Sequence, residues 1–123
     1  MRKALEMRTM RLSDIVKACD LQVICGDMLL DREVSGGYVS DLLSDVMANS
    51  KKGDIWITLQ AHPNIVAVAL LKEITGIIMV NGRKPEEETV KKANEEKLPV
   101  MITDMPTFEV VGKLYNLGIR GKH

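Results

Sequence analysis

Polar side chains follow three short apolar runs of the sequence, and these side chains have the chemistry to bind a ligand. They are Gln60, His62 and Asn64 after the first run, Asn81, Gly82, Arg83 and Lys84 after the second, and Thr103 and Asp104 after the third. Hydrogen-bonding groups beside helix N-termini, whose N–H groups lack partners, can hold a phosphate or a carboxylate without a glycine-rich loop. Arg83 and Lys84 would supply positive charge from the margin. We therefore take these residues as the candidate ligand-binding site.

Each of these residues also has a structural interpretation. A histidine in a turn can order that turn by bonding to nearby backbone, and Asn and Thr commonly cap helices or fill turns. Asn64 suits a helix cap, Asn81-Gly82 is an ordinary turn pair, and exposed charges such as Arg83 and Lys84 are usually solvated. Substituting His62 and Asn81 with Ala separates the interpretations. A site predicts weaker ligand binding at a nearly unchanged melting temperature, whereas turn scaffolding predicts unfolding.

Motifs for catalysis, cofactors and metals do not occur in the sequence. It contains neither G-x-x-x-x-G-K-[ST] nor G-x-G-x-x-G, and no G-x-S-x-G elbow. With Cys19 and Cys25 as the only cysteines, there is no disulfide framework and no zinc spacing. The carboxylates of Glu86–Glu88 point about 100° apart on a helix and do not converge on a metal ion. We therefore predict no catalytic residues, no metal site and no cofactor.

The segments around the candidate residues predict how they are positioned. The apolar runs Ile55–Leu59, Gly76–Val80 and Val100–Thr103 alternate with segments long enough for helices, which Pro63 and Pro85 open. This pattern predicts a βαβαβ unit with parallel strands and right-handed crossovers, within a three-layer α/β fold that has a mainly parallel sheet. Ligands bind to open sheets of this kind at the carboxyl ends of the strands, where the candidate residues fall.

The rest of the chain predicts additional elements of a single domain over residues 1–123. Residues 1–10 are expected to fray. The elements are a helix capped by Ser13 and ending near Cys19, a strand at Leu21–Cys25, a strand at Glu33–Asp41 broken by glycines, a helix at Leu42–Ala48, and a last helix containing Phe108 and ending at Gly118.

Composition limits the classes of partner. The chain has 17 basic and 17 acidic residues, so its net charge is zero, which argues against nucleic acid as a partner. No apolar run reaches membrane-spanning length and no signal-peptide pattern is present, so we expect a cytoplasmic protein with no membrane partner. Apolar residues at Met28–Leu30 and in the Leu42–Met47 helix predict a homodimer or larger homo-oligomer.

Four sequence segments carry a family resemblance: Gly53-Asp54, Gln60-Ala61-His62-Pro63-Asn64, Asn81-Gly82-Arg83-Lys84-Pro85 and Leu98-Pro99-Val100. From Leu12 to Gly118 the chain resembles stand-alone DRTGG-domain proteins. Those proteins are similar to the N-terminal domain of HPr kinase/phosphorylase and to inserts in phosphotransacetylases and CBS-domain pyrophosphatases. The chain departs from the pattern that names the family: the Asp-Arg pair falls near Ala61-His62 and Thr-Gly-Gly falls on Val80-Asn81-Gly82, where only Gly82 is retained.

The resemblance implies a non-catalytic regulatory, ligand-sensing or interaction module with the fold of the HPr kinase N-terminal domain. Kinase activity in that enzyme belongs to a P-loop domain, whose motif this sequence lacks. The expected partners are a phosphate-bearing small molecule, a redox or kinase protein, and further copies of the chain. Two alternatives remain open. One is a small enzyme with His62 as acid and base, for which the sequence shows no activating neighbour, and the other is a purely structural oligomerisation adaptor.

Overall fold

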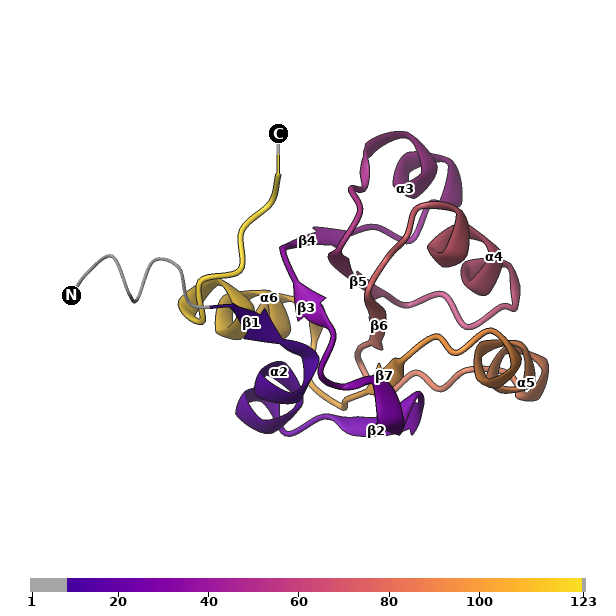
Figure 1. The fold of residues 1–123 in the computed structure, drawn as a ribbon, viewed down its shortest axis with the longest axis horizontal. Helices are drawn as coiled ribbons and strands as arrows, with labels where there is room; N and C mark the ends of the chain where they lie inside the picture. Colours follow the sequence, from indigo (N-terminus) through magenta and orange to yellow (C-terminus); the bar gives the residue numbers. More distant parts are fainter. Residues whose placement is uncertain (1–8, 123) are drawn as a thin grey trace.

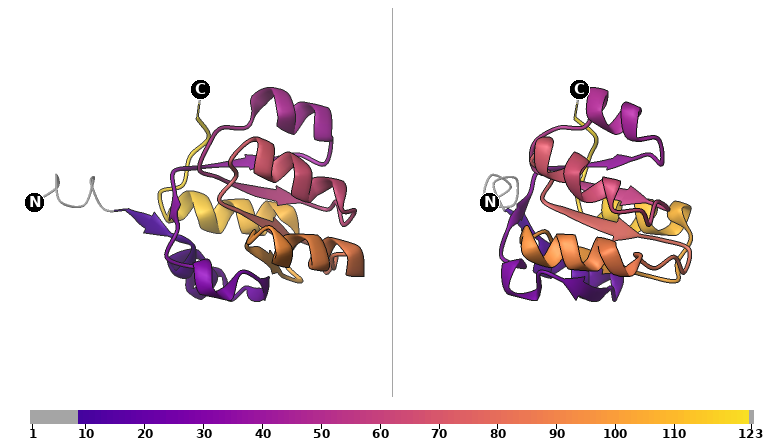
Figure 2. Two further views of the ribbon diagram at one scale, coloured as in Figure 1. Left: turned by 45° about the vertical axis from the view of Figure 1, so that its right-hand side comes forward. Right: turned by 90° about the vertical axis from the view of Figure 1, so that its right-hand side faces the viewer.

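The computed structural model describes residues 9–122, which form a central sheet between two layers of helices (Figures 1 and 2). The sheet has five strands in the order β2-β7-β6-β5-β4. They are β2 (Gln22–Cys25), β4 (Gly36–Val39), β5 (Asp54–Thr58), β6 (Gly76–Met79) and β7 (Val100–Ile102). Strands β4, β5, β6 and β7 of this sheet are mutually parallel, and its β2 strand pairs antiparallel with β7. The predicted parallel arrangement is therefore confirmed.

Helices cover both faces of the sheet. Three of them, α3 (Leu43–Asn49), α4 (Asn64–Leu71) and α5 (Glu87–Glu95), lie on one face, while α2 (Leu12–Cys19) and α6 (Thr107–Asn116) lie on the other (Figure 2). The short strands β1 (Met10–Arg11) and β3 (Glu33–Val34) pair with each other, and η1 (Asp27–Leu29) is a 3₁₀ turn. The predicted three-layer α/β fold is confirmed.

Alternation along the strands divides the core between the two faces. Ile55 and Ile57 pack towards α2 and α6, whereas Trp56 packs towards α3, α4 and α5. The Trp56 side chain is fully buried, and its indole N–H donates a 2.9 Å hydrogen bond to the carbonyl of Ser40. Strands with apolar residues on both faces fit a parallel sheet that is covered on both sides.

The predicted start of three helices is wrong by one or two residues. Helix α2 begins at Leu12, so Ser13 lies inside its first turn instead of capping it. Helix α3 begins at Leu43. The N–H of Leu42, the residue before it, donates a 3.1 Å hydrogen bond to the Ser40 hydroxyl. Helix α5 begins at Glu87, two residues after Pro85, because Glu86 still has an extended backbone.

The predictions for the N-terminus and for the apolar surface have mixed outcomes. Residues 1–8 of the segment expected to fray lie outside the described residues, and Met10 belongs to β1. Met28 and Leu42 are 89% and 64% exposed, but Val46 is fully buried in the core. The Leu42–Met47 helix therefore does not present the continuous apolar surface that the sequence predicted.

The turn that follows β2 brings two backbone segments unusually close. Gly26 has a φ of +77°, and a Cβ atom added there would lie 2.7 Å from the Cα of Pro99, just before β7. The β2–β7 register also shifts between Val23 and Cys25, so the chain bends at this point. Only glycine satisfies both the backbone angle and the available space.

A C-terminal segment after α6 runs along the outer side of β4. Ile119 is buried, and the carbonyl of Arg120 accepts a 3.1 Å hydrogen bond from the N–H of Gly37. The ammonium of Lys122 lies 3.3 Å from a carboxylate oxygen of Asp54, a residue that is only 1% exposed. This segment therefore supplies the cation that faces a buried carboxylate.

Candidate functional site

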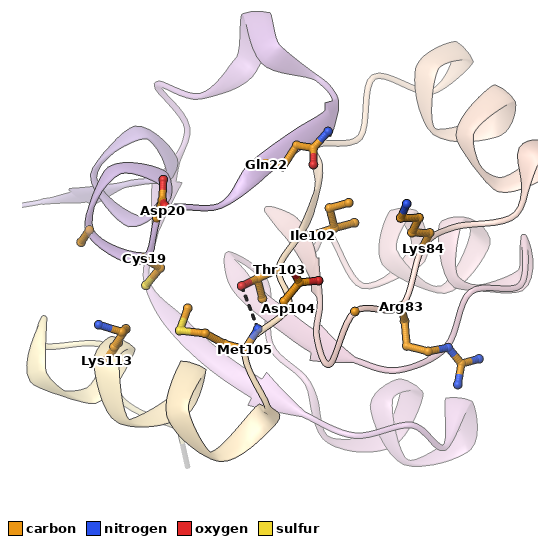
Figure 3. A pocket seen from close by; sticks show the side chains of 12 residues that line it. Cys19, Asp20, Gln22, Arg83, Lys84, Ile102, Thr103, Asp104, Met105 and Lys113 are labelled. Atoms are coloured by element: carbon orange, nitrogen blue, oxygen red, sulfur yellow. Dashed lines mark hydrogen bonds between the residues drawn. The ribbon is translucent and has the colours of Figure 1, made fainter.

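A cavity of about 550 Å³ lies at the carboxyl edge of the parallel strands. Four parts of the chain surround it: the junction of α2 and β2, the β6–α5 loop, the β7–α6 loop and helix α6 (Figure 3). It is lined by Ala18, Cys19, Asp20, Gln22, Gly82, Arg83, Lys84, Ile102, Thr103, Asp104, Met105 and Lys113. Small-molecule sites typically enclose about 300–1,000 Å³, so the cavity has the size of a ligand pocket.

Five of the predicted site residues line this cavity: Gly82, Arg83, Lys84, Thr103 and Asp104. Backbone hydrogen bonds join the two loops that carry them. The Asn81 N–H donates to the carbonyl of Met105 at 2.8 Å, and the Gly82 N–H donates to the carbonyl of Thr103 at 3.0 Å. These hydrogen bonds fix the position of the β6–α5 loop relative to the β7–α6 loop.

The other four predicted residues lie at the same edge of the sheet but do not line the cavity. Gln60 donates its amide N–H to the carbonyl of Asp41 at 2.8 Å. His62 accepts the backbone N–H of Asn64 on Nδ1 at 3.1 Å, and the Asn64 side chain is exposed. Asn81 holds its turn with a φ of +61°. The structure thus gives Gln60, His62 and Asn81 roles in ordering loops.

The φ of Asn81 changes one expected outcome. Alanine in a left-handed conformation costs about 1–2 kcal/mol, and asparagine tolerates that conformation better. Substituting His62 and Asn81 with Ala is therefore no longer expected to leave the melting temperature unchanged. A sharper test needs substitutions inside the cavity.

Three polar residues of the cavity were missed by the sequence analysis: Asp20, Gln22 and Lys113. Asp20 ends α2 with a φ of +53°, and Gln22 begins β2, where it pairs with Ile102. Because β2 is antiparallel, its first residue, not its last, lies at the carboxyl edge of the sheet. Nothing in the local sequence indicates this orientation.

Charged residues of both signs line the cavity. Figure 3 shows Lys113 on one side of Thr103 and Asp104, and Arg83 and Lys84 on the other. With Asp20, the lining carries three cations and two carboxylates, a net charge of +1. Within residues 9–122 these five side chains form no ion pair within 4.0 Å, since the ion pairs found there are Lys52–Glu73 and Lys122–Asp54.

The cysteine in the cavity wall is not poised to react. Burial raises the pKa of the Cys19 thiol above its usual value of 9.0, and the positive charge of Lys113 offsets only part of this effect. The thiol is therefore protonated near neutral pH, and the thiolate is the nucleophilic form. Within residues 9–122 no group of three His, Cys, Asp or Glu side chains is placed to hold a metal ion.

The two helix N-termini expected to attract an anion have other neighbours. Glu87 and Glu88 occupy the first turn of α5, where their negative charge balances the positive end of the helix dipole. At α4, the N–H of Asn64 already donates to His62. The cations at the cavity are therefore the side chains of Arg83, Lys84 and Lys113.

The fold and this cavity together define an open-sheet α/β domain with a ligand-sized pocket at the carboxyl ends of its strands. The DRTGG domain family model matches residues 14–117, and the chain belongs to this family. The resemblance predicted from the sequence is confirmed. No curated protein matches the chain.

A solved structure with a similar fold is that of the CBS and DRTGG domains of the regulatory region of Clostridium perfringens pyrophosphatase, complexed with its activator diadenosine tetraphosphate. The TM-score is 0.69 at 17% sequence identity, and the match covers 84% of this chain and 45% of that one. At this identity the likeness shows the fold alone. Within residues 9–122, no helix is long and apolar enough to cross a membrane.

Proposed function

We propose that the protein is a non-catalytic, ligand-sensing regulatory module that binds a phosphate-bearing small molecule in the cavity between β2, β7 and α6. The observation that carries this proposal is the set of five charged residues that line one cavity and form no ion pairs with one another. Membership of the DRTGG family and the nucleotide activator bound by the regulatory region of the pyrophosphatase support it.

Arg83, Lys84 and Lys113 are the groups proposed to bind the phosphate. Arginine can donate two parallel hydrogen bonds to a phosphate, while lysine supplies a compact positive charge. All three side chains are exposed, so salt screens their attraction for an anion. The proposed affinity is therefore modest, and it should fall as ionic strength rises.

The two alternative functions receive less support from the site. An enzyme based on His62 would use a residue outside the cavity whose Nδ1 already accepts a backbone N–H. A purely structural adaptor would leave the ligand-sized cavity without a role. A ligand-sensing module accounts for the charges and for the size of the cavity.

Titration calorimetry with inorganic pyrophosphate tests the proposal directly. The Arg83→Gln/Lys113→Gln double variant should weaken binding at least tenfold, because a hydrogen bond to a charged group contributes about 1.5–3 kcal/mol. Lys91→Gln/Lys92→Gln is the matched control, since it removes the same charge from α5 residues that do not line the cavity. Equal weakening in both variants, or no binding by the unmodified protein at low salt, would contradict the proposal.

We also propose that the protein self-associates. Exposed apolar side chains include Phe108 at 85% and Tyr115 at 56% on α6, and Val39 at 45% on β4. Val39 and Tyr115 line one shallow hollow, so they are neighbours on the surface. Sedimentation velocity should show a homodimer or larger species that Phe108→Ser/Tyr115→Ser weakens. A monomer at micromolar concentration would contradict this, and a redox or kinase protein partner would then become the better explanation of the exposed surface.

A further inference from the structure

Carboxylates in the wall of the cavity restrict the chemistry of its ligand. Asp20 and Asp104 line the same hollow as Arg83, Lys84 and Lys113. A carboxylate repels a phosphate, but it accepts hydrogen bonds from hydroxyl or amino groups. A ligand that fits all five side chains therefore carries donor groups as well as a phosphate.

Geometry separates the two kinds of group within the cavity. Arg83 and Lys84 come from the β6–α5 loop, and Lys113 comes from α6. Figure 3 shows Thr103 and Asp104 between these cations. The Thr103 hydroxyl accepts the N–H of Met105 at 3.2 Å and still has a proton to donate. The middle of the cavity thus offers groups that bind hydroxyls, while the cations lie towards its two sides.

Among residues 9–122, no aromatic side chain lines the cavity. Its apolar contacts come from Ala18, Ile102 and Met105. Trp56 is buried beneath the opposite face of the sheet, and Phe108 and Tyr115 are exposed on α6 outside the lining. Stacking on aromatic rings is one strong way to bind a nucleobase, and for stacking this lining offers only the guanidinium of Arg83.

We propose that the ligand is the phosphate ester of a polyhydroxylated, non-aromatic compound, of the sugar phosphate type, and not a nucleotide. This inference rests on the proposed function, since it specifies the ligand of the same cavity. The phosphate binds to the basic side chains on one side of the cavity, and the hydroxyl groups donate to Asp104 and Asp20.

The test compares four probes by titration calorimetry: inorganic phosphate, glucose 6-phosphate, unphosphorylated glucose and AMP. Glucose 6-phosphate should bind at least tenfold more tightly than inorganic phosphate or AMP, and glucose should bind much more weakly. Asp104→Asn should weaken glucose 6-phosphate several-fold while leaving inorganic phosphate unchanged or tighter, because a repulsive charge is removed. Asp20→Asn should act in the same direction, and asparagine tolerates the left-handed backbone at that position. Asp31→Asn, an exposed residue outside the cavity, is the matched control.

The outcomes distinguish this inference from the proposed function. Tighter binding of AMP than of glucose 6-phosphate would overturn the inference and leave the phosphate site intact. The same conclusion follows if Asp104→Asn changes both phosphate probes equally. Failure of every phosphate-bearing probe, pyrophosphate included, would overturn the proposed function itself.

Discussion

The close approach of the backbone at Gly26 yields a quantitative prediction for Gly26→Ala. Gly118 is the matched control, because its φ is also positive, at +102°, but a Cβ atom there would meet nothing within 4 Å. For either residue a left-handed alanine costs about 1–2 kcal/mol, less about 0.4–1 kcal/mol because alanine restricts the unfolded chain. Gly118→Ala should therefore lose about 1 kcal/mol of unfolding free energy.

Gly26→Ala carries an additional cost. The added Cβ would lie 2.7 Å from Cα and 2.9 Å from N of Pro99, and these backbone atoms are fixed by the start of β7. Overpacking of this kind costs about 1–3 kcal/mol, so the total loss should be about 2–4 kcal/mol. For a domain of this size, each kcal/mol lowers the melting temperature by roughly 3–5 °C.

Urea unfolding followed by the fluorescence of Trp56 measures both losses. Trp56 is the only tryptophan and is fully buried, so its emission should shift to longer wavelength when the core opens. Gly26→Ala should lower the transition midpoint clearly more than Gly118→Ala does. Equal midpoints for the two variants would refute the reasoning, because the backbone contact with Pro99 would then contribute nothing.

Three further predictions concern other parts of the domain. Gly112→Ala should stabilise the protein by about 0.5–1 kcal/mol in the same urea assay, because Gly112 lies inside α6 with open space around it; a loss of stability would contradict this. Lys122→Met should destabilise the fold by about 1–3 kcal/mol by leaving the buried Asp54 carboxylate without its cation, and adding Asp54→Asn should recover part of the loss; no recovery would show that the ion pair is not the cause. Hydrogen bonds from Ser40, Tyr38 and Asn49 hold the pKa of Asp45 below its usual 3.8. The contribution of Asp45 to the free energy of unfolding should therefore be present above about pH 4 and be lost as the pH falls through the folded-state pKa. A difference in unfolding free energy between wild type and Asp45→Asn that stayed constant from pH 7 to pH 2 would refute this.

The sequence predicts the parallel part of the fold because burial on both faces leaves a clear pattern. Strands β6 and β7 are continuous apolar runs, and β5 has three consecutive apolar residues, Ile55–Ile57, at its centre. The segments between these strands are long enough for crossover helices. The pairing of β2 leaves no such pattern. The side chains of this four-residue strand would alternate between the two faces of the sheet in the same way whether the strand ran parallel or antiparallel. Its antiparallel placement beside β7 therefore depends on long-range packing that the local sequence does not encode.

The sequence predicted those residues of the candidate site that follow correctly predicted parallel strands. Gly82, Arg83, Lys84, Thr103 and Asp104 follow β6 and β7, and the structure brings them together around one cavity. Gln22 and Lys113 were missed because each belongs to an element whose position is set by tertiary contacts. His62 and Gln60 were included because they follow β5, but that strand lies farther from β2, and their hydrogen bonds order its own loop.

The C-terminal segment beside β4 has a consequence for the behaviour of the protein at high concentration. An edge strand with unpaired N–H groups is a template for pairing with other chains, which leads to aggregation. Here the Arg120 carbonyl occupies the outward N–H of Gly37, and Lys122 places a positive charge at the same edge. A chain shortened after Gly118 would expose this edge. It should then form thioflavin-positive assemblies on mild heating, at temperatures where the full chain stays dispersed.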